Sequence, residues 1–146
     1  MPTLIDTNIL LRSIQPSHPM HPVAVRALEA LMAKEEPLCL AIQNVAKFWN
    51  AATRPLGSNG LGYSHEKARE EIDRLEGFFE ILSESAASYA AWKELVTSAG
   101  VSGVQVHDAR LAAVMKINGI TRIVTFNVQD FKRFGGIEAI HPDSVV

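Results

Sequence analysis

The sequence contains a single cysteine, Cys39, among its 146 residues. A lone cysteine excludes an internal disulfide, and its place in the apolar run Leu38–Ala41 favours a small buried side chain. Long hydrophobic runs are also missing, because no apolar stretch approaches the roughly 20 residues that a membrane-spanning helix needs. The first residues, MPTLIDTN, lack the basic segment and the apolar stretch of a signal peptide. We therefore expect a cytoplasmic protein without a membrane partner.

An excess of positive charge is absent as well. The 14 lysine and arginine residues are outnumbered by 16 aspartate and glutamate residues, which gives a formal net charge of −2. Proteins that coat nucleic acid without sequence preference are usually basic, so the charge gives no support to a histone-like or scaffold role. A nuclease is still compatible with this balance, because an acidic metal site can offset a local basic rim.

The composition that remains, 47% apolar and 21% charged, suits one compact domain over residues 1–146. Short apolar runs alternate with helical patterns, and this alternation predicts an α/β sandwich with a mostly parallel sheet. The expected strands are Thr3–Ile5, Leu38–Ala41, Phe78–Leu82, Ile123–Phe126 and Ile137–Ile140. The expected helices are Asn8–Ile14, Val23–Lys34, Asn44–Thr53, Ser64–Glu76, Ser85–Gly100, Val106–Asn118 and Gln129–Phe134.

Three aspartates lie at junctions between these elements. Asp6 directly follows the first strand, Asp108 lies in the first turn of a helix, and Asp130 follows Asn127 a few residues after a strand. In such folds ligands bind beyond the carboxyl ends of the strands. Hard divalent cations prefer oxygen ligands, and Mg²⁺ commonly uses a few carboxylates together with water and phosphate. The placement therefore permits a metal site.

Each aspartate also has a purely structural interpretation. Asp6 and Asp130 can cap the short helices beside them, and Asp108 can complement the positive end of a helix dipole. Taken singly, each carboxylate is better explained in this way. Taken together, the two interpretations are evenly balanced on the residues alone.

Four blocks in this order resemble the PIN domain family, and in particular the VapC-type toxin ribonucleases of bacterial toxin–antitoxin pairs. They are LIDTNILLR (Leu4–Arg12), FWNAATRP (Phe48–Pro55), GVQVHDARLAA (Gly103–Ala113) and IVTFNVQDFKRF (Ile123–Phe134). The resemblance covers essentially the whole chain. It implies a PIN-like three-layer sandwich, in which a mostly parallel central sheet is flanked by helices.

The same resemblance implies a metal-dependent endoribonuclease, the toxin of a toxin–antitoxin pair. Asp6 matches the family's first acid and Asp108 its third, while Asn127 and Asp130 match the late segment that helps to hold metal or water. The implied catalytic residues are Asp6, Asp108 and Asp130, which with Asn127 would bind Mg²⁺ or Mn²⁺. The implied partners are an RNA substrate, a cognate antitoxin protein and a second copy of the chain. Three basic residues are candidates for holding RNA phosphates, although each is better explained as an ordinary surface charge: Arg12, Lys132 and Arg133.

The sequence departs from the family at the second acid, where a glutamate is expected and Lys47 is found. No aspartate or glutamate occurs anywhere from Pro37 to Tyr63, so a shift of register cannot recover it. Either Lys47 lies inside the acidic cluster and weakens metal binding, or its side chain extends into solvent and leaves three aspartates to bind one metal. The alternative function is a catalytically degenerate PIN domain that binds RNA or a protein partner without cleavage. A response-regulator-like switch domain is a weaker option, because the sequence lacks an early acidic pair.

Two further patterns are interpreted as loops. The glycine-rich segment PLGSNGLGY (Pro55–Tyr63) follows a helix rather than a strand and lacks the residues of a phosphate-binding loop. His18 and His21 are flanked by prolines, which prevent them from forming a zinc-binding pair on one helix.

Overall fold

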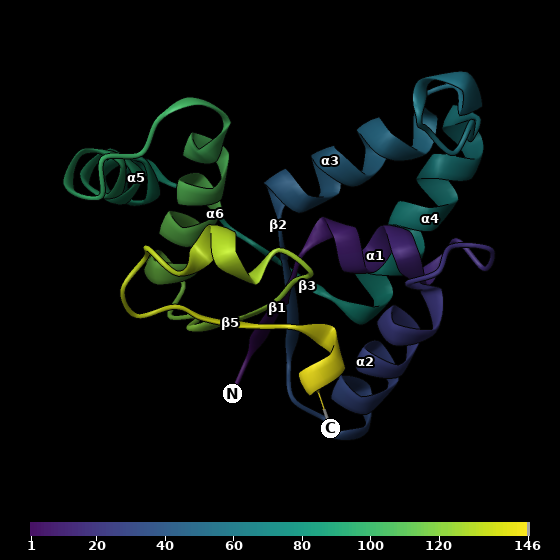
Figure 1. Ribbon diagram of the computed structural model, residues 1–146, viewed down its shortest axis with the longest axis horizontal. Helices are drawn as coiled ribbons and strands as arrows, with labels where there is room; N and C mark the ends of the chain where they lie inside the picture. Colours follow the sequence, from purple (N-terminus) through teal and green to yellow (C-terminus); the bar gives the residue numbers. More distant parts are fainter. Residues whose placement is uncertain (146) are drawn as a thin grey trace.

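The computed structural model describes residues 1–145, which form a five-stranded sheet between two layers of helices (Figure 1). All neighbouring strands are parallel, and their order is β3-β2-β1-β4-β5. The expected three-layer α/β sandwich is confirmed, and the sheet is parallel throughout. The strands are β1 (Thr3–Ile5), β2 (Leu38–Ala41), β3 (Glu80–Leu82), β4 (Arg122–Val124) and β5 (Glu138–Ile140).

Four α-helices cover one face of the sheet and two cover the other (Figure 1). The first group is α1 (Thr7–Ser13), α2 (His21–Ala33), α3 (Ile42–Thr53) and α4 (His65–Phe78), and the second is α5 (Ala86–Ser98) and α6 (Val106–Ile117). Short 3-10 turns lie at Leu56–Ser58 (η1), Gly103–Gln105 (η2), Val128–Phe131 (η3) and Pro142–Ser144 (η4). None of the helices described in residues 1–145 is long and apolar enough to cross a membrane.

Two apolar clusters, one on each face of the sheet, form the core. In β1, Leu4 packs into the cluster under α5 and α6, whereas Ile5 packs into the cluster under α1 to α4. In β2, Cys39 and Leu40 divide between the two clusters in the same way. This alternation follows from the two-residue period of a strand, and a sheet covered on both faces favours apolar residues at successive positions of its central strands. Cys39 is buried and unpaired, as expected.

Several predicted boundaries were wrong by a few residues. The fourth strand ends at Val124 rather than Phe126, and the following turn is a 3-10 helix, Val128–Phe131, rather than an α-helix. Helix α4 continues through Gly77 to Phe78, so β3 begins only at Glu80. Helix α2 begins at His21, because a proline is tolerated in the first helical turn.

The order in which the chain visits the strands creates a switch point at the centre of the sheet, between β1 and β4. From β1 the chain passes outwards to β2 and β3, and it then crosses back so that β4 pairs with the other side of β1. The connections therefore run in opposite directions on either side of the β1–β4 pair. Ligands of open parallel sheets bind beyond the carboxyl ends of the strands at such a switch point. In this chain that position is occupied by Asp6 and by the segment after Val124.

Candidate functional site

An open pocket of about 370 Å³ lies beyond the carboxyl ends of β1 and β4. Its lining combines residues from the start of α1, from one face of α3, from the start of α6 and from η3. The lining residues are Asp6, Thr7, Asn8, Leu11, Lys47, Asn50, Ala51, Arg54, Asp108, Asn127, Asp130 and Phe131. The structure thus brings the four predicted residues, Asp6, Asp108, Asn127 and Asp130, into one pocket.

Asp6 is held in place by hydrogen bonds to both of its carboxylate oxygens. The backbone N–H of Thr7 donates to Oδ1 at 2.8 Å, which makes Asp6 the N-cap of α1. The hydroxyl of Thr125 donates to Oδ2 at 2.7 Å. Asp6 is therefore both the helix cap and a pocket residue, so the two interpretations of this aspartate are compatible.

Thr125 is the centre of a small hydrogen-bond network beside the pocket. Its one hydroxyl proton goes to Asp6, and its oxygen accepts from the backbone N–H of Asn127 at 3.0 Å and from the Asn8 amide at 3.4 Å. A hydroxyl has one donor and two acceptor positions, so this group is fully used. The network fixes the segment after β4 against the start of α1.

Replacing Thr125 is expected to destabilise the fold through this network. Thr125→Val removes the hydroxyl while keeping the shape, and a lost hydrogen bond to a charged group costs about 1.5–3 kcal/mol. Urea unfolding of the wild type, Thr125→Val and Thr125→Ser measures the difference. Because Thr125→Ser keeps the hydroxyl, it should lose clearly less; equal losses would show that the methyl group, not the hydrogen bonds, is what matters.

The two helical walls of the pocket are also tied to each other and to α1. The Gln43 amide of α3 donates to the backbone carbonyl of His107 in α6 at 2.9 Å. The Thr7 hydroxyl of α1 donates to the backbone carbonyl of Asn44 in α3 at 3.1 Å. Gln43, Asn44 and Thr7 are all buried. These buried contacts hold α3, α6 and α1 at fixed positions around the aspartates.

Burial and mutual repulsion act on the aspartates together. Burial raises the pKa of Asp6 above its ordinary value of 3.8, although the hydrogen bonds from Thr125 and Thr7 and the charge of Lys47 oppose this rise. Burial also raises the pKa of Asp108, and the nearby charge of Asp130 adds to the effect. Lys47 again acts in the opposite direction. The carboxylates are thus close enough to disfavour one another's ionisation, and a cation would relieve this repulsion.

The raised pKa of Asp108 leads to a pH-dependent prediction. The folded state holds the Asp108 proton more tightly than the unfolded chain, so ionised Asp108 lowers stability at neutral pH. Asp108→Asn should therefore raise the melting temperature at neutral pH, and the gain should shrink as the pH falls through the raised pKa towards 3.8. Thermal unfolding over a pH series tests this, with Asp73→Asn on the exposed face of α4 as the control. A gain that does not depend on pH would contradict the prediction.

Oxygen ligands of the right kind for a hard divalent cation line the pocket. Three carboxylates and three asparagine amides line it, and this donor chemistry fits Mg²⁺ or Mn²⁺. Across residues 1–145, however, no three acidic, imidazole or thiolate side chains are arranged so that they would hold one ion. The structure therefore does not show the full predicted set closing on a metal. It fits the commoner magnesium arrangement, in which one or two carboxylates bind together with water and substrate phosphate.

Lys47 shows features of both interpretations of the sequence, the one that placed it among the acids and the one that placed its side chain in solvent. It lines the pocket, and its charge lowers the pKa of both Asp6 and Asp108. The residue is nevertheless exposed, and within the described part of the chain its ammonium has no carboxylate within 4.0 Å. Lys47 thus acts on the acids through space, without a direct ion pair.

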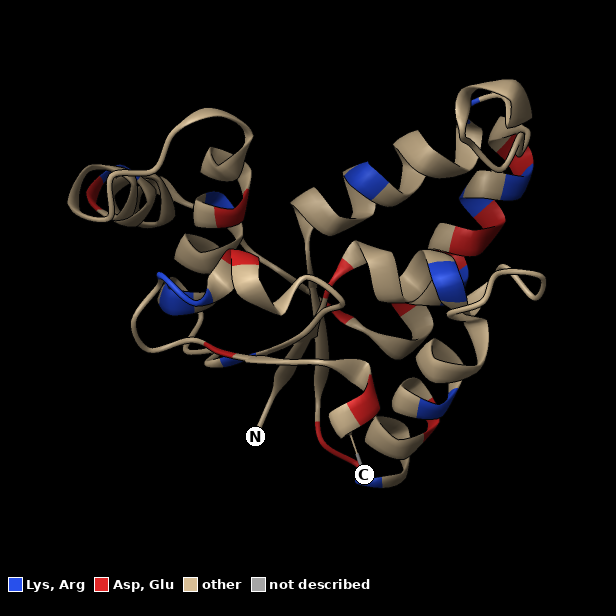
Figure 2. Cartoon of the chain, in the orientation of Figure 1, with Lys and Arg blue, Asp and Glu red and all other residues tan. Residues whose placement is uncertain are grey.

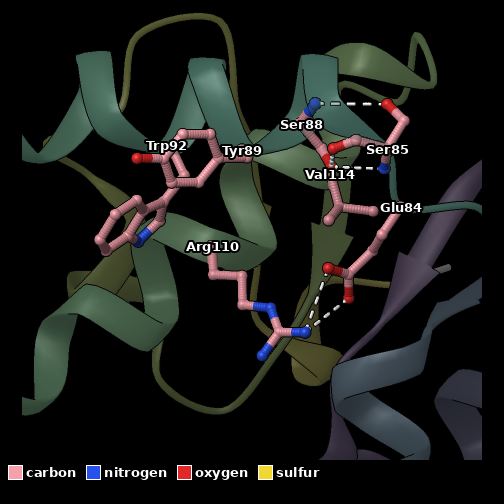
Figure 3. Close-up of a pocket in the computed structure, with 7 residues that line it drawn as sticks. All are labelled: Glu84, Ser85, Ser88, Tyr89, Trp92, Arg110 and Val114. Atoms are coloured by element: carbon pink, nitrogen blue, oxygen red, sulfur yellow. Dashed lines mark hydrogen bonds and ion pairs between the residues drawn. The ribbon is translucent and has the colours of Figure 1, made fainter.

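A second hollow of about 270 Å³, between α5 and α6, is a poorer candidate for chemistry (Figure 3). Its residues are Glu84, Ser85, Ser88, Tyr89, Trp92, Arg110 and Val114. Its charged groups, Arg110 and Glu84, neutralise each other at 2.9 Å. Ser85 and Ser88 are used in capping α5. Arg110 follows Asp108 by two helical residues and so lies on a different side of α6 from the aspartate pocket.

The comparisons with known proteins agree with this geometry. The model of the PIN domain family matches residues 3–137. The chain belongs to the PIN domain family. A comparison with curated protein sequences finds no match.

Solved structures with the same fold include several toxin–antitoxin proteins. VapBC2 from Rickettsia felis, bound to a DNA fragment from its promoter, is 20% identical, with 97% of this chain and 98% of that chain covered and a TM-score of 0.71. VapBC-1 from nontypeable Haemophilus influenzae is 15% identical, with coverage of 97% and 98% and a TM-score of 0.69. The Mycobacterium tuberculosis toxin VapC20, which cleaves the sarcin–ricin loop, is 22% identical, with coverage of 83% and 86% and a TM-score of 0.59. At these identities the likeness shows that the PIN fold is shared.

The basic residues of this PIN domain differ from those expected. Arg12, Lys132 and Arg133 are not among the described residues that line the pocket, and the Arg12 guanidinium donates to Gln15 at 2.7 Å. The basic residues that do line it are Lys47 and Arg54. Arg54, like Asn50 and the supporting Thr125, was missed in the sequence. For Asn50 and Arg54, the only signal in the sequence was their spacing of three and seven residues from Lys47. No signal in the sequence pointed to Thr125.

Proposed function

We propose that this PIN domain is a metal-dependent endoribonuclease and the toxin of a toxin–antitoxin pair. The observation that carries the proposal is the meeting of Asp6, Asp108 and Asp130 in one open pocket at the switch point of the sheet. Membership of the family supports it. So does the shared fold of VapC20, a toxin that cleaves the sarcin–ricin loop. The substrate class that follows is RNA.

The residues of the pocket divide the work of hydrolysis between them. Thr125 and the N-terminus of α1 hold Asp6 in one orientation. Among residues 1–145, nothing donates a hydrogen bond to the carboxylates of Asp108 or Asp130, so both are free to bind a ligand or to accept a proton. In the proposed reaction one carboxylate takes a proton from water as the water oxygen bonds to phosphorus. The ribose oxygen then leaves and takes up a proton from solvent.

The ion would be held by Asp6 and Asp108, with Asp130 and Asn127 holding water. When bound, Mg²⁺ or Mn²⁺ makes water more acidic and offsets the negative charge that develops on the phosphate. Burial is the main cause of the raised pKa values of Asp6 and Asp108, and repulsion by neighbouring carboxylates adds to it. A nearby cation would relieve this repulsion, which supports the assignment.

Two protein partners belong to the proposal. A cognate antitoxin is supported by the toxin–antitoxin complexes that share the fold.

A homodimer is expected from the apolar side chains left on the surface, among them Ile42, Phe78 and Ile81. A stable dimer should bury more than about 1,000 Å² in total. Light scattering at micromolar concentration should give twice the 16.0 kDa mass of the chain, and a monomer would contradict the expectation.

The position of Lys47 supports a second candidate function. Because its ammonium lines the pocket, the domain can instead be a degenerate PIN protein that binds RNA or a protein without cutting. The two functions differ in one assay. Purified protein is incubated with single-stranded RNA and Mn²⁺, Mg²⁺ or EDTA. A nuclease cleaves the RNA with metal and does not cleave it with EDTA. RNA that stays intact in all three conditions would support the degenerate domain instead.

A further inference from the structure

One face of α3 presents a polar stripe to the pocket. Lys47 and Asn50 are three residues apart in α3 and lie on one side of the helix, and Arg54 is the C-cap residue directly after Thr53. All three are exposed and all three line the pocket. Between Met1 and Val145, neither Lys47 nor Arg54 has a carboxylate within 4.0 Å. The Arg54 guanidinium donates a long hydrogen bond to the backbone carbonyl of Asn59 at 3.4 Å, which leaves its charge without a counter-ion. Because no carboxylate neutralises either charge of the stripe, both can attract an anion.

The opposite side of the pocket is acidic. Figure 2 shows the acidic segments at the start of α1, on α6 and on η3 lying across from the basic band on α3. Three aspartates near one phosphate repel it, and the repulsion falls with distance. Lys47 compensates for this next to the acids, whereas Arg54 lies two helical turns away at the end of α3. The stripe thus leads from the acidic centre outwards.

The glycine-rich loop after α3 fixes the outer end of the stripe. The backbone N–H groups of Leu61, Gly62 and Tyr63 donate to the carbonyls of Ala51, Arg54 and Ala52 at 2.8–3.1 Å. Gly60 packs so tightly that a Cβ there would overlap the backbone carbonyl of Arg54. The loop therefore satisfies the last carbonyls of α3 and holds the Arg54 backbone. Its glycines serve close packing, and it is not a phosphate loop.

We propose that Lys47, Asn50 and Arg54 bind the sugar–phosphate backbone of single-stranded RNA, with Lys47 at the phosphate next to the aspartates and Arg54 at a flanking phosphate. The inference rests on the proposed function, since it names the substrate contacts of the same pocket. A lysine and an arginine offer charge-assisted hydrogen bonds to phosphate oxygens, and the Asn50 amide can donate to a phosphate or a ribose hydroxyl.

The inference is tested by RNA binding in EDTA, where metal and cleavage play no part. The probe is a fluorescein-labelled single-stranded RNA oligonucleotide, and fluorescence anisotropy gives its dissociation constant over a series of salt concentrations. Each phosphate contact with a single strand contributes about 0.7 to the slope of log K against log salt. Lys47→Gln and Arg54→Gln should each weaken binding several-fold at low salt and reduce the slope by about that amount.

Matched controls remove the same charge elsewhere. Lys93→Gln on α5 and Arg69→Gln on α4 change exposed residues outside the pocket lining and should leave the affinity and the slope unchanged. If Lys47→Gln and Arg54→Gln also leave both unchanged, or if all four variants weaken binding equally, the inference is wrong. Intact RNA in the metal assay together with the expected loss of binding would reject the nuclease and retain the stripe.

A pair of glycine variants tests the clamp on Arg54. Gly60→Ala forces the loop away from the Arg54 carbonyl, whereas a Cβ at Gly57 meets nothing within 4 Å. Gly60→Ala should weaken RNA binding towards the level of Arg54→Gln, and Gly57→Ala should not. If Gly60→Ala lowers the melting temperature so far that binding cannot be compared, the Arg54 and Lys47 variants decide the matter alone. A folded Gly60→Ala variant with wild-type affinity would overturn the positioning role of the loop.

Discussion

Asp6→Asn is expected to lower the rate of RNA cleavage at least about a hundredfold, because losing a metal-binding carboxylate removes several kcal/mol of charge stabilisation from the transition state. The fold should survive the change. Asparagine is also a good N-cap, so its oxygen can still accept from Thr7. Its NH2 group then faces Thr125 and cannot accept from that hydroxyl, which costs about 1.5–3 kcal/mol, but the substitution also removes a carboxylate whose pKa is raised by burial. Rates measured with excess RNA and saturating Mn²⁺ give the effect.

The control for this experiment makes the same aspartate-to-asparagine change outside the pocket. Asp73→Asn alters an exposed aspartate on α4 and should cleave RNA at the wild-type rate. Binding of RNA in EDTA should not fall in Asp6→Asn, because the carboxylate repels phosphate rather than holding it. Cleavage by Asp6→Asn within a few-fold of the wild type would remove Asp6 from the proposed mechanism.

Lys47→Glu is expected to tighten Mn²⁺ or Mg²⁺ binding at least about tenfold, which corresponds to about 1.4 kcal/mol. The substitution changes the local charge by two units in a pocket where Lys47 already acts on Asp6 and Asp108. It also supplies the acid that the sequence lacks between Pro37 and Tyr63. Titration calorimetry with Mn²⁺ on the two proteins side by side gives the affinities. Cleavage at saturating RNA should rise with metal affinity.

Three comparisons separate the causes. Lys47→Gln removes the ammonium without adding a carboxylate, so its metal affinity should lie between those of the wild type and Lys47→Glu. Lys93→Glu makes the same charge change on α5 and should leave metal affinity unaltered. Adding Asp6→Asn should abolish cleavage in either background. Equal Mn²⁺ affinities for the wild type and Lys47→Glu would show that Lys47 does not oppose metal binding.

The same variant links the metal proposal to the RNA stripe. In EDTA, Lys47→Glu should bind RNA more weakly than Lys47→Gln, because a fourth carboxylate then faces the phosphate. With metal present, the bound cation offsets this loss. Lys47→Glu should therefore bind metal better and metal-free RNA worse, and these two effects of opposite sign cannot both come from damage to the fold.

The strands that the sequence predicted most accurately are those buried on both faces. Thr3–Ile5 and Leu38–Ala41 were predicted with the bounds found in the structure, because every residue in them is buried and a proline precedes each of them. Strand β4 was predicted to begin one residue too late and to end two residues too late. Thr125 continues the β-branched pattern, but its side chain is used for Asp6 rather than for the strand. Composition alone does not distinguish these two uses.

The acidic part of the site was visible in the sequence for a topological reason. Parallel strands bring their carboxyl ends to one edge of the sheet, so residues that follow different strands meet without any knowledge of side-chain contacts. Asp6 and Asp130 follow this rule, and Asp108 is added by the family resemblance. The resemblance also identified position 47 as the site of the missing acid.

The supporting residues could not be predicted, because their contacts join distant parts of the chain. Thr125 and Asp6 are 119 positions apart, and Gln43 and His107 are 64 positions apart. Nothing local to either residue indicates its partner. The role of Gly60 was hidden for a similar reason, since the glycine-rich segment was interpreted only as a loop, while the structure uses Gly60 for close packing against Arg54.

The exposure of Lys47 has a consequence for how such a site can evolve. Exposed positions away from the core usually change stability by less than about 0.5 kcal/mol when substituted, so position 47 can vary without endangering the fold. Lysine and glutamate codons differ by a single nucleotide. A lineage carrying this scaffold can therefore exchange a cation for a metal-binding acid, and reverse the exchange, in one mutational step.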